Sequence, residues 1–322
     1  MRRSYLSTLL FIMLFTIPLK SQPYYLQWTK GANFPIRLSE INAITCNNKI
    51  YVVGGMITND NNDYKDNELV DFTFEYDLGN KVWTKKANMP FKEYDIALAT
   101  ANDRIFAIGS KTAMYNPAKN TWQELKSLED GKAHLRVAVV SGKIYMIGFF
   151  ECANPNKIMM YDPQTDSWIE KASIPTARLA PSVTVVKNKI YVIAGLGLKE
   201  NGRVDISKRL QSIEVYDPES DTWEIKKPMP KQLFGAKWII VNDNRIFFIN
   251  IDSDENNHKY NTYIYHPESE NWSPVEMNLP AKCYDSQGIT LLNNKIYLIG
   301  GHDDTFVQYN DVFIGTIEQT NQ

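Results

Sequence analysis

The sequence contains little cysteine. Its 322 residues include 3 cysteines, Cys46, Cys152 and Cys283. Three are too few for a disulfide framework in a chain of this length, so packing must hold the fold together. A nucleophilic Cys283 assisted by His134 or His302 is one interpretation of this residue. A plain loop thiol is the simpler one, because no catalytic motif surrounds it.

Long hydrophobic runs are missing except at the N-terminus. There "YLSTLLFIMLFTIPL" (5–19) follows Arg2 and Arg3, and Ser21 offers a small residue for cleavage. This pattern predicts a signal peptide over 1–21, and export to the periplasm or out of the cell. A retained membrane anchor is the alternative, although the run is short for a stable span. After cleavage we expect no stable membrane span.

The chain has no excess of positive charge. Its 35 basic and 37 acidic residues give a net charge of −2. Removal of segment 1–21, which holds Arg2, Arg3, Lys20 and no acid, lowers that charge by three, to about −5. A nucleic-acid partner is therefore disfavoured, since no basic patch could neutralise phosphates.

Against these absences stands a repeat. The decamer "NNKIYVVGGM" (47–56) returns in related form at 102, 141, 187, 243 and 293. Its isoleucines are Ile50, Ile105, Ile144, Ile190, Ile246 and Ile296, spaced by 39 to 56 residues. A period near 50 with strands in each unit is typical of a propeller and not of a helical solenoid.

A second motif follows the first five copies. Tyrosine precedes tryptophan by seven residues, as in "YDPQTDSW" (161–168). Asp, Asn and Pro between them favour a hairpin turn that joins two strands. An alternating stretch upstream, such as "SVTVV" (182–186), is joined to the decamer through a polar pair that suits a tight hairpin. Each unit therefore predicts four antiparallel strands.

The chain ends predict how a ring would close. The sixth copy is followed by "DVFIGTI" (311–317) but by no tryptophan, whereas an orphan tryptophan strand, "YYLQWTKGANFP" (24–35), stands at the start. We expect 22–35 and 283–317 to form one closing blade, which leaves no free sheet edge. The fold class is thus all-β, with 22–322 forming a single six-bladed propeller of four-stranded blades.

This pattern resembles the kelch-repeat β-propeller family. The residues that carry the resemblance, or repeat with it, are Gly54, Gly55, Gly300, Gly301, Trp28, Trp83, Trp122, Trp168, Trp223 and Trp272. The glycine pair is broken in four copies, for example at Ala194–Gly195, which leaves the local geometry open there. The resemblance implies that the face carrying the loops after each second strand is the binding face.

On that face the loops 56–68, 149–157, 195–209, 250–261 and 301–308 are long and polar, and binding residues collect on such loops. The segments leading into each first strand should form the rim of the central channel. The candidate binding residues there are Arg37, Glu40, Lys92, Tyr94, Asp95, His134, Arg136, Arg178, Tyr284 and Asp285, with Lys237 in the fifth unit. Solvated loop charges are the alternative for each of them.

Metal and cofactor chemistry finds little support. His134, His258, His266 and His302 lie in different units without ligand spacing, which argues against a copper oxidase site. "DSDENN" (252–257) lacks the glycine and the closing glutamate of a calcium loop, and "HDD" (302–304) is a weak metal candidate. We expect no cofactor, no metal and no catalytic residue.

Three functions follow as hypotheses. The first is an exported binding module for an extracytoplasmic protein or glycan, which rests largely on fold-level analogy. The second is a sugar-processing enzyme, similar to the sialic-acid mutarotases among exported kelch propellers, which would recruit Arg37, Glu40, Arg178 and Asp285. The third is a structural envelope component. Ligand identity and oligomeric state stay open.

Overall fold

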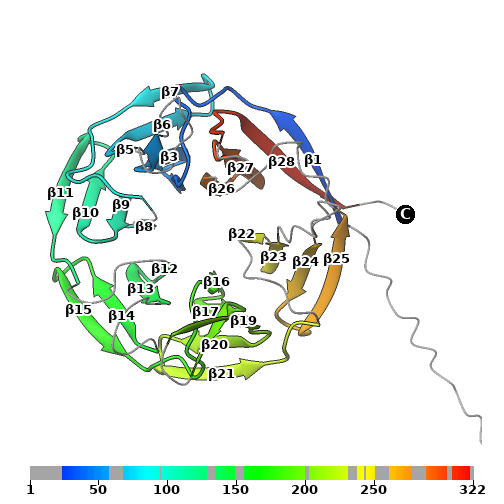
Figure 1. Ribbon diagram of the computed structural model, residues 1–322. Coiled ribbons are helices and arrows are strands. Elements are labelled where there is room, and N and C mark those ends of the chain that lie inside the picture. Colours follow the sequence, from blue (N-terminus) through cyan, green and yellow to red (C-terminus); the bar gives the residue numbers. More distant parts are fainter. Residues whose placement is uncertain are drawn as a thin grey trace, which may run out of the picture.

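A computed structural model describes residues 24–57, 68–94, 96–128, 135–148, 156–199, 203–230, 238–242, 244–250, 261–276, 288–302 and 307–319. Its main strands form six antiparallel four-stranded blades arranged in a ring (Figure 1). The predicted six-bladed propeller is confirmed. Within the described ranges, no helix has the length and apolar character needed to cross a membrane.

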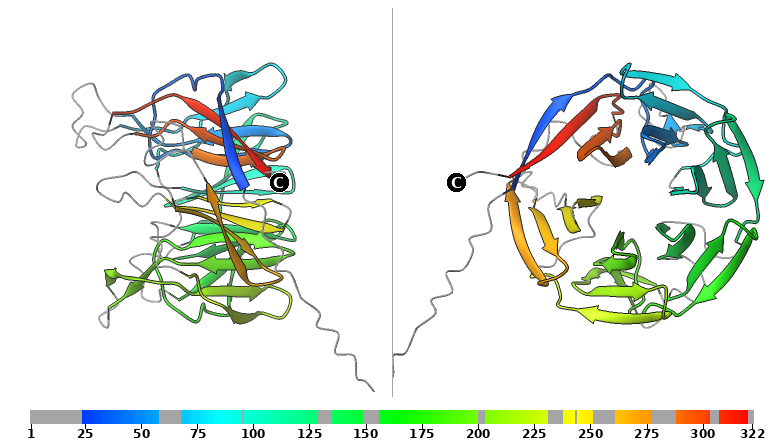
Figure 2. Two further views of the ribbon diagram at one scale, coloured as in Figure 1. Left: turned by 90° about the vertical axis from the view of Figure 1, so that its right-hand side faces the viewer. Right: turned by 180° about the vertical axis from the view of Figure 1, so that it is seen from behind.

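The blades follow one another in chain order, with the first strand nearest the centre (Figures 1 and 2). Blade one consists of β2 (Asn42–Cys46), β3 (Lys49–Val53), β6 (Thr73–Asp77) and β7 (Val82–Lys85). Blade two consists of β8 (Ala97–Ala101), β9 (Arg104–Ile108), β10 (Thr112–Asn116) and β11 (Thr121–Leu125). Blade three consists of β12 (Arg136–Val140), β13 (Lys143–Ile147), β14 (Ile158–Asp162) and β15 (Ser167–Lys171). Blade four consists of β16 (Ser182–Val186), β17 (Lys189–Ile193), β20 (Ile213–Asp217) and β21 (Thr222–Lys226). Blade five consists of β22 (Trp238–Asn242), β23 (Arg245–Asn250), β24 (Asn261–His266) and β25 (Asn271–Glu276). Blade six consists of β26 (Gly288–Leu292), β27 (Lys295–Ile299), β28 (Val312–Gln319) and β1 (Tyr24–Lys30).

The ring closes through β1, as predicted from the tryptophan strand at the N-terminal end of the sequence. β1 pairs antiparallel with β28 from Tyr24↔Gln319 to Lys30↔Phe313. The start of β1 also pairs in parallel with β25 of blade five, so blades five and six share one continuous sheet. A single strand therefore joins both ends of the chain and ties the closing blade to its neighbour.

Tight hairpins between the first and second strands match the predicted turn chemistry. Asn47 and Asn48 have φ of 49° and 58°, and the pairs 102–103, 141–142, 187–188 and 293–294 are left-handed at both positions as well. Two successive positive φ values define the type I′ turn, which asparagine, aspartate and glycine tolerate best. At the far end of β17, Ala194 keeps φ 58° where Gly54 has 66°, so the broken glycine pair does not change the chain direction there.

The core consists of interfaces between blades. The second strands are almost wholly buried, as in β3 and β9, because each lies between two neighbouring sheets. Apolar clusters fill each junction. One joins Phe106 of blade two to Ile144 of blade three, and another joins Tyr191 of blade four to Phe248 of blade five. Full burial of each such side chain contributes about 1.5–3 kcal/mol.

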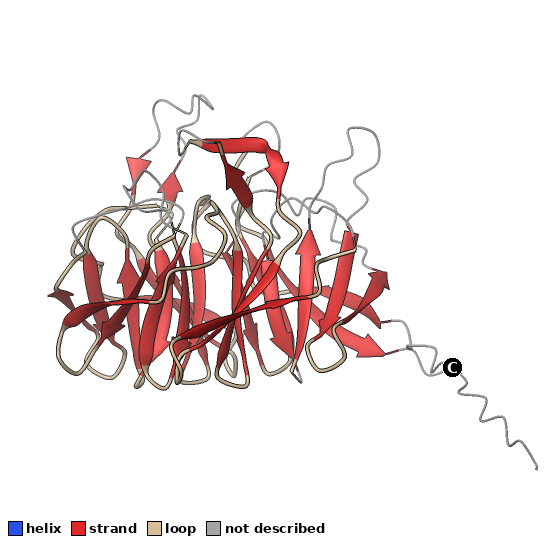
Figure 3. Cartoon of the chain, turned by 90° about the horizontal axis from the view of Figure 1, so that it is seen from below, coloured by secondary structure: helices blue, strands red, loops and turns tan. Residues whose placement is uncertain are grey.

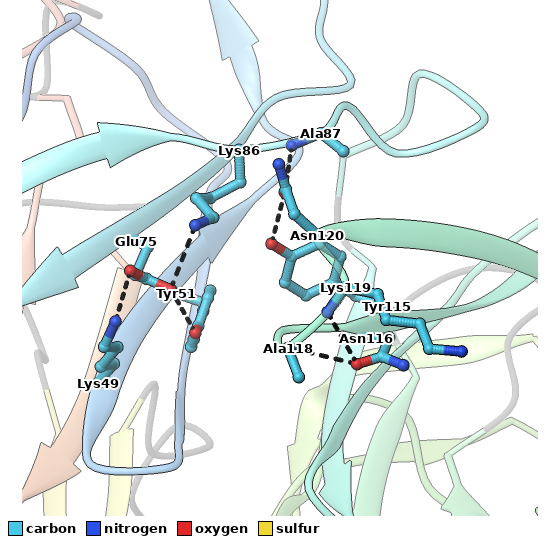
Figure 4. A network of polar contacts seen from close by, with 10 residues as sticks. All are labelled: Lys49, Tyr51, Glu75, Lys86, Ala87, Tyr115, Asn116, Ala118, Lys119 and Asn120. Atoms are coloured by element: carbon cyan, nitrogen blue, oxygen red, sulfur yellow. Dashed lines mark hydrogen bonds and ion pairs between the residues drawn. The ribbon is translucent and has the colours of Figure 1, made fainter.

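Each tryptophan motif also clamps neighbouring blades with hydrogen bonds. Asn120, two residues before Trp122, has φ 52° and accepts hydrogen bonds from the Ala87 N–H and the Tyr115 hydroxyl, both at 2.8 Å (Figure 4). Trp122 Nε1 donates back to the Ala87 carbonyl at 3.0 Å. The tryptophan motif therefore holds the end of the preceding outer strand by hydrogen bonds; we call this arrangement the clamp.

The clamp recurs in the next two blades. Asp166 accepts from the Lys126 N–H and the Tyr161 hydroxyl, while Trp168 Nε1 donates to the Lys126 carbonyl at 2.8 Å. Asp221 makes the same contacts in blade four, with the Ala172 N–H at 2.9 Å. In blade five Glu270 accepts from the Lys227 N–H at 3.0 Å. In each case a side-chain oxygen of the motif accepts a hydrogen bond from a backbone N–H of the preceding blade, and this bond links the two blades.

Candidate functional site

Two faces of the ring differ sharply. One carries short hairpin turns, and the other carries the longer connections and two small two-stranded sheets (Figure 3). We call the second the loop face. The small sheets are β4 (Met56–Ile57) with β5 (Glu68–Leu69), and β18 (Leu196–Leu198) with β19 (Val204–Arg209). The prediction of plain polar loops over 56–68 and 195–209 was therefore incomplete, because both segments contain strands.

Hydrogen bonds tie the segments before the first strands to these connections. Ser39 and Met56 exchange both backbone bonds, at 3.1 and 2.9 Å, and Leu179 and Leu196 do the same in blade four. Between blades, the Gly301 N–H donates to the Leu38 carbonyl at 3.0 Å. The segments before β2 and β16 are thereby held against the connections on the loop face.

Six of the ten candidate rim residues lie in the described part of the chain, while Asp95, His134, Tyr284 and Asp285 lie outside it, as does Lys237. Arg37 and Tyr94 are exposed, and Tyr94 keeps 44% of its surface accessible. Lys92 is exposed as well, but its ammonium pairs with Glu68 of β5 at 2.8 Å. The hydrogen bond to Lys92 lowers the pKa of Glu68, and the same contact raises the pKa of Lys92.

Glu40 and Arg136 are partly buried. Glu40 has φ 51°, and its carboxylate lies 3.9 Å from Nε2 of His302, which is buried in blade six. Arg136 opens β12 and donates to the Leu135 carbonyl at 3.0 Å. These two side chains are thus engaged with the protein, in contrast to the exposed Arg37.

Arg178 differs most from its prediction. Its side chain is 1% exposed, so it does not line an open rim. The guanidinium donates to the carbonyls of Thr176 and Ala194, to the Ser212 hydroxyl and to the carboxylate of Glu214, which is equally buried. Burial lowers the pKa of Arg178, and Glu214 opposes that shift. Arg178 is a structural residue inside blade four, and the rim assignment was wrong because chain position did not reveal side-chain direction.

Sequence reasoning missed the exposed hairpin β18–β19. Ile206 of β19 is 77% exposed, the largest exposed fraction among the exposed large apolar side chains of the described residues. The alternation in "VDISKR" (204–209) was the available signal for a strand, but it was absorbed into a loop of polar composition. Together with Arg37 and Tyr94, Ile206 gives the loop face side chains that can contact a partner.

Metal ligands do not cluster in the described ranges: no group of three or more His, Cys, Asp or Glu side chains could hold an ion there. The segment 252–257 and positions 303–304 lie outside those ranges, as do Cys152 and Cys283. Cys46 is a buried free thiol, and burial raises its pKa to about 11. Such a thiol is protonated at neutral pH and is a poor nucleophile.

Comparison with known proteins agrees with this architecture. A sequence model of the KLHDC2/KLHL20/DRC7 Kelch-repeats domain matches residues 113–301, more than half of the chain. The chain belongs to the kelch-repeat family.

Its curated relatives are longer kelch proteins. Rat Kelch-like protein 24 is 32% identical over 238 residues, 71% of this chain and 37% of that protein. Rat Kelch-like protein 36 is 23% identical over 86% of this chain and 38% of that protein. Human Kelch repeat and BTB domain-containing protein 12 is 25% identical over 41% of this chain and 25% of its own length. The kelch propeller described here thus spans well under half of each of these relatives.

A solved structure shares the fold. The structure of YjhT superimposes with a TM-score of 0.67 and 14% sequence identity, covering 90% of this chain and 99% of that one. At this identity the likeness concerns the fold alone. Kelch propellers serve in general as protein-binding modules, and the rigid ring with variable loops on one face is the basis of that use.

Proposed function

We propose that this kelch propeller is an exported module that binds a protein partner on its loop face. The observation that carries the proposal is the hairpin β18–β19, which extends from that face with Ile206 77% exposed. Exposed apolar and aromatic side chains bordered by charges are typical of recognition surfaces. Tyr94 and Arg37 provide the aromatic and the basic contact on the same face.

Export rests on the N-terminal sequence. Segment 1–21 lies outside the described residues, and the propeller begins at β1, three residues beyond it. A cleavage after Ser21 would therefore leave every described strand intact. N-terminal sequencing of the protein recovered from its native host tests this part: a start at or near Gln22 supports export, and a start at Met1 contradicts it.

The binding part is tested by site-specific photo-crosslinking. A photoreactive residue placed at Ile206 or Tyr94 should give discrete adducts with one partner in the native compartment. The same residue at Glu219, in an exposed turn on the opposite face, is the matched control. Excess unlabelled propeller should compete the adducts away. Equal labelling at all three positions, or none at any, would contradict a partner on the loop face.

A glycan ligand is the second class that this face would suit. A glycan array separates the two: selective glycan binding that is lost in the Tyr94→Ala variant, without protein adducts, would replace the protein partner by a sugar.

The sugar-processing enzyme has less support. Of the residues that it would recruit, Arg178 is buried against Glu214 and is not free to bind a substrate carboxylate. Asp285 lies outside the described residues. The two remaining residues are Arg37, which could bind a substrate carboxylate, and Glu40, which would lack the second group of an acid–base pair. Any sugar found on the array should also be followed by NMR for exchange of its anomers.

A further inference from the structure

A cavity of about 340 Å³ lies between blades six and one, on the outer side of the ring near the closing strand. Its walls come from the end of β1, from the β6–β7 hairpin, and from β27 and β28. It is separate from the loop-face connections, since none of its lining residues belongs to them. Nothing in the proposed function depends on it.

The cavity lies at a junction where the clamp between blades lacks its acceptor oxygen. At four of the other junctions the residue two before tryptophan supplies an oxygen: Asn120, Asp166, Asp221 or Glu270. In the closing blade the residue two before Trp28 is the apolar Leu26. Figure 4 shows this arrangement around Asn120. In blade one the corresponding residue is Lys81, which keeps the left-handed backbone with φ 55° but has no acceptor atom in its side chain. A donor has replaced an acceptor.

Several neighbouring donors consequently have no acceptor among the described residues. Trp83 Nε1 still donates to the Ala32 carbonyl, at 3.3 Å. The Ala32 N–H, however, has no partner among the described residues, whereas the corresponding Ala87 N–H donates to Asn120.

Two buried tyrosines in the cavity wall show the same deficit. Tyr76 is 3% exposed, and its hydroxyl has no partner in the described chain. The equivalent hydroxyls of Tyr115, Tyr161 and Tyr216 donate to the clamp oxygen, whereas that of Tyr265 in blade five has no partner either among the described residues. Tyr297 is 4% exposed, and its hydroxyl is equally without a described partner. Neither hydroxyl oxygen is a fully buried atom, so both can be reached from the cavity.

Lys295 of blade six lacks the carboxylate partner that the equivalent lysines of other blades have. At the start of the second strand, Lys143 pairs with Asp162 in blade three, and Lys189 pairs with Asp217 in blade four. In blade six the residue opposite Lys295 is Thr316, so Lys295 has no ion pair within the described ranges. Lys295 also lines the cavity.

The nearby acids do not compensate for these charges. Asp311 pairs with Lys30 at 2.8 Å, and Asp77 accepts a hydrogen bond from the Asn80 N–H at 2.9 Å. The wall therefore presents two exposed ammonium groups that have no ion pair among the described residues, two hydroxyls and one amide, all able to donate. Donors that converge on one cavity favour an anion with several acceptor oxygens.

We propose that this cavity binds an oxyanion, such as phosphate, sulfate or a carboxylate, whose oxygens take the place of the missing clamp residue. The anion would accept from the Ala32 N–H and the two tyrosine hydroxyls, and it would neutralise Lys81 and Lys295. It would thereby complete the hydrogen bonding of the junction at which the ring closes.

Titration of the purified propeller with sodium phosphate, sodium sulfate and sodium acetate, at constant ionic strength set with chloride, tests the proposal. Calorimetry and thermal unfolding should give saturable binding and a saturable rise in Tm for at least one anion. The three arms distinguish tetrahedral oxyanions from a carboxylate. Lys81→Asn, which installs the residue of blade two, should weaken binding at least about tenfold. Tyr297→Phe should weaken it less.

Lys119→Asn is the matched control, because Lys119 is an exposed lysine in the corresponding turn of blade two and should leave binding unchanged. Lys81→Asn should also raise the Tm without anion, since it supplies the absent acceptor. If that variant does not fold, Lys295→Gln replaces it. A rise in Tm that is not saturable, or that is equal in native protein and Lys81→Asn, is a general salt effect and would overturn the proposal.

Discussion

At the residue scale, Arg178 and Glu214 form an ion pair in which each side chain is 1% exposed. Blade one carries Leu38 and Phe74 at the same two positions, both in its apolar cluster. Arg178→Leu alone leaves a buried carboxylate without its partner and should lower the free energy of unfolding by roughly 3–5 kcal/mol. The double variant Arg178→Leu/Glu214→Phe should recover most of that loss. Urea unfolding measures both, and a single variant as stable as the double would refute the argument.

Asp221 sets a second expectation, for acid conditions. Burial raises the pKa of Asp221, but hydrogen bonds from Tyr216, Ala172 and Lys171 outweigh burial and lower the pKa overall. A carboxylate with a depressed folded-state pKa stabilises the fold above its unfolded pKa of about 3.9 and loses that contribution as pH falls through the folded value. Asp221→Asn should therefore show a smaller fall in Tm between about pH 5 and pH 3. A fall in Tm as large in this variant as in the native protein would contradict the argument.

Chain position and side-chain direction explain what could be predicted at this scale. Arg37 and Arg178 were grouped because both precede a first strand by a similar distance. The structure aligns Arg178 with Leu38 and not with Arg37, because the bridges Ser39↔Met56 and Leu179↔Leu196 fix the register. One residue of offset separates an exposed side chain from a buried one, and spacing in the sequence does not resolve it.

At the scale of the element, the hairpin turns carry the blade-to-blade clamp. Asp166→Ala would leave the Lys126 N–H and the buried Tyr161 hydroxyl without an acceptor, at a cost of roughly 1–3 kcal/mol. Alanine also tolerates the φ of 46° at this position poorly. Asp166→Asn should cost less than about 1 kcal/mol, because Asn120 already performs this role in blade two. Chemical denaturation of the two variants separates the acceptor from its charge, and equal costs would contradict the clamp.

Elements of the repeat were predictable because their chemistry is local. Polar pairs such as Asn47–Asn48 adopt the left-handed turn that their residue types favour, and the motif from tyrosine to tryptophan closes a hairpin within eight residues. The hairpin β18–β19 was not predicted, because its strands are short and pair only with each other. Its composition is that of a loop, with charged residues at three of the six positions 203–208.

At the scale of the whole molecule, stability is distributed over interfaces that form a closed cycle. Each blade contacts two neighbours, and the cycle depends on a strand from one chain end pairing with strands from the other. Long-range pairing of this kind is costly to form, but it covers the edge of β28 and the end of β25. The orphan tryptophan strand made the closure predictable, since a blade that lacks its outer strand requires one.

Removal of β1 tests this closure directly. A chain that begins at Ala32 should lose a cooperative unfolding transition and expose β28 and β25 as edges, because β1 is the strand that pairs with both. Exposed edges pair between molecules, so light scattering after size exclusion should show dimers or larger species. A chain that begins at Gln22 keeps all of β1 and should unfold in one transition as the native protein does. A monomeric, cooperatively folded chain from Ala32 would mean that the blade-to-blade interfaces alone hold the ring, and that the strand exchanged between the chain ends contributes little to its stability.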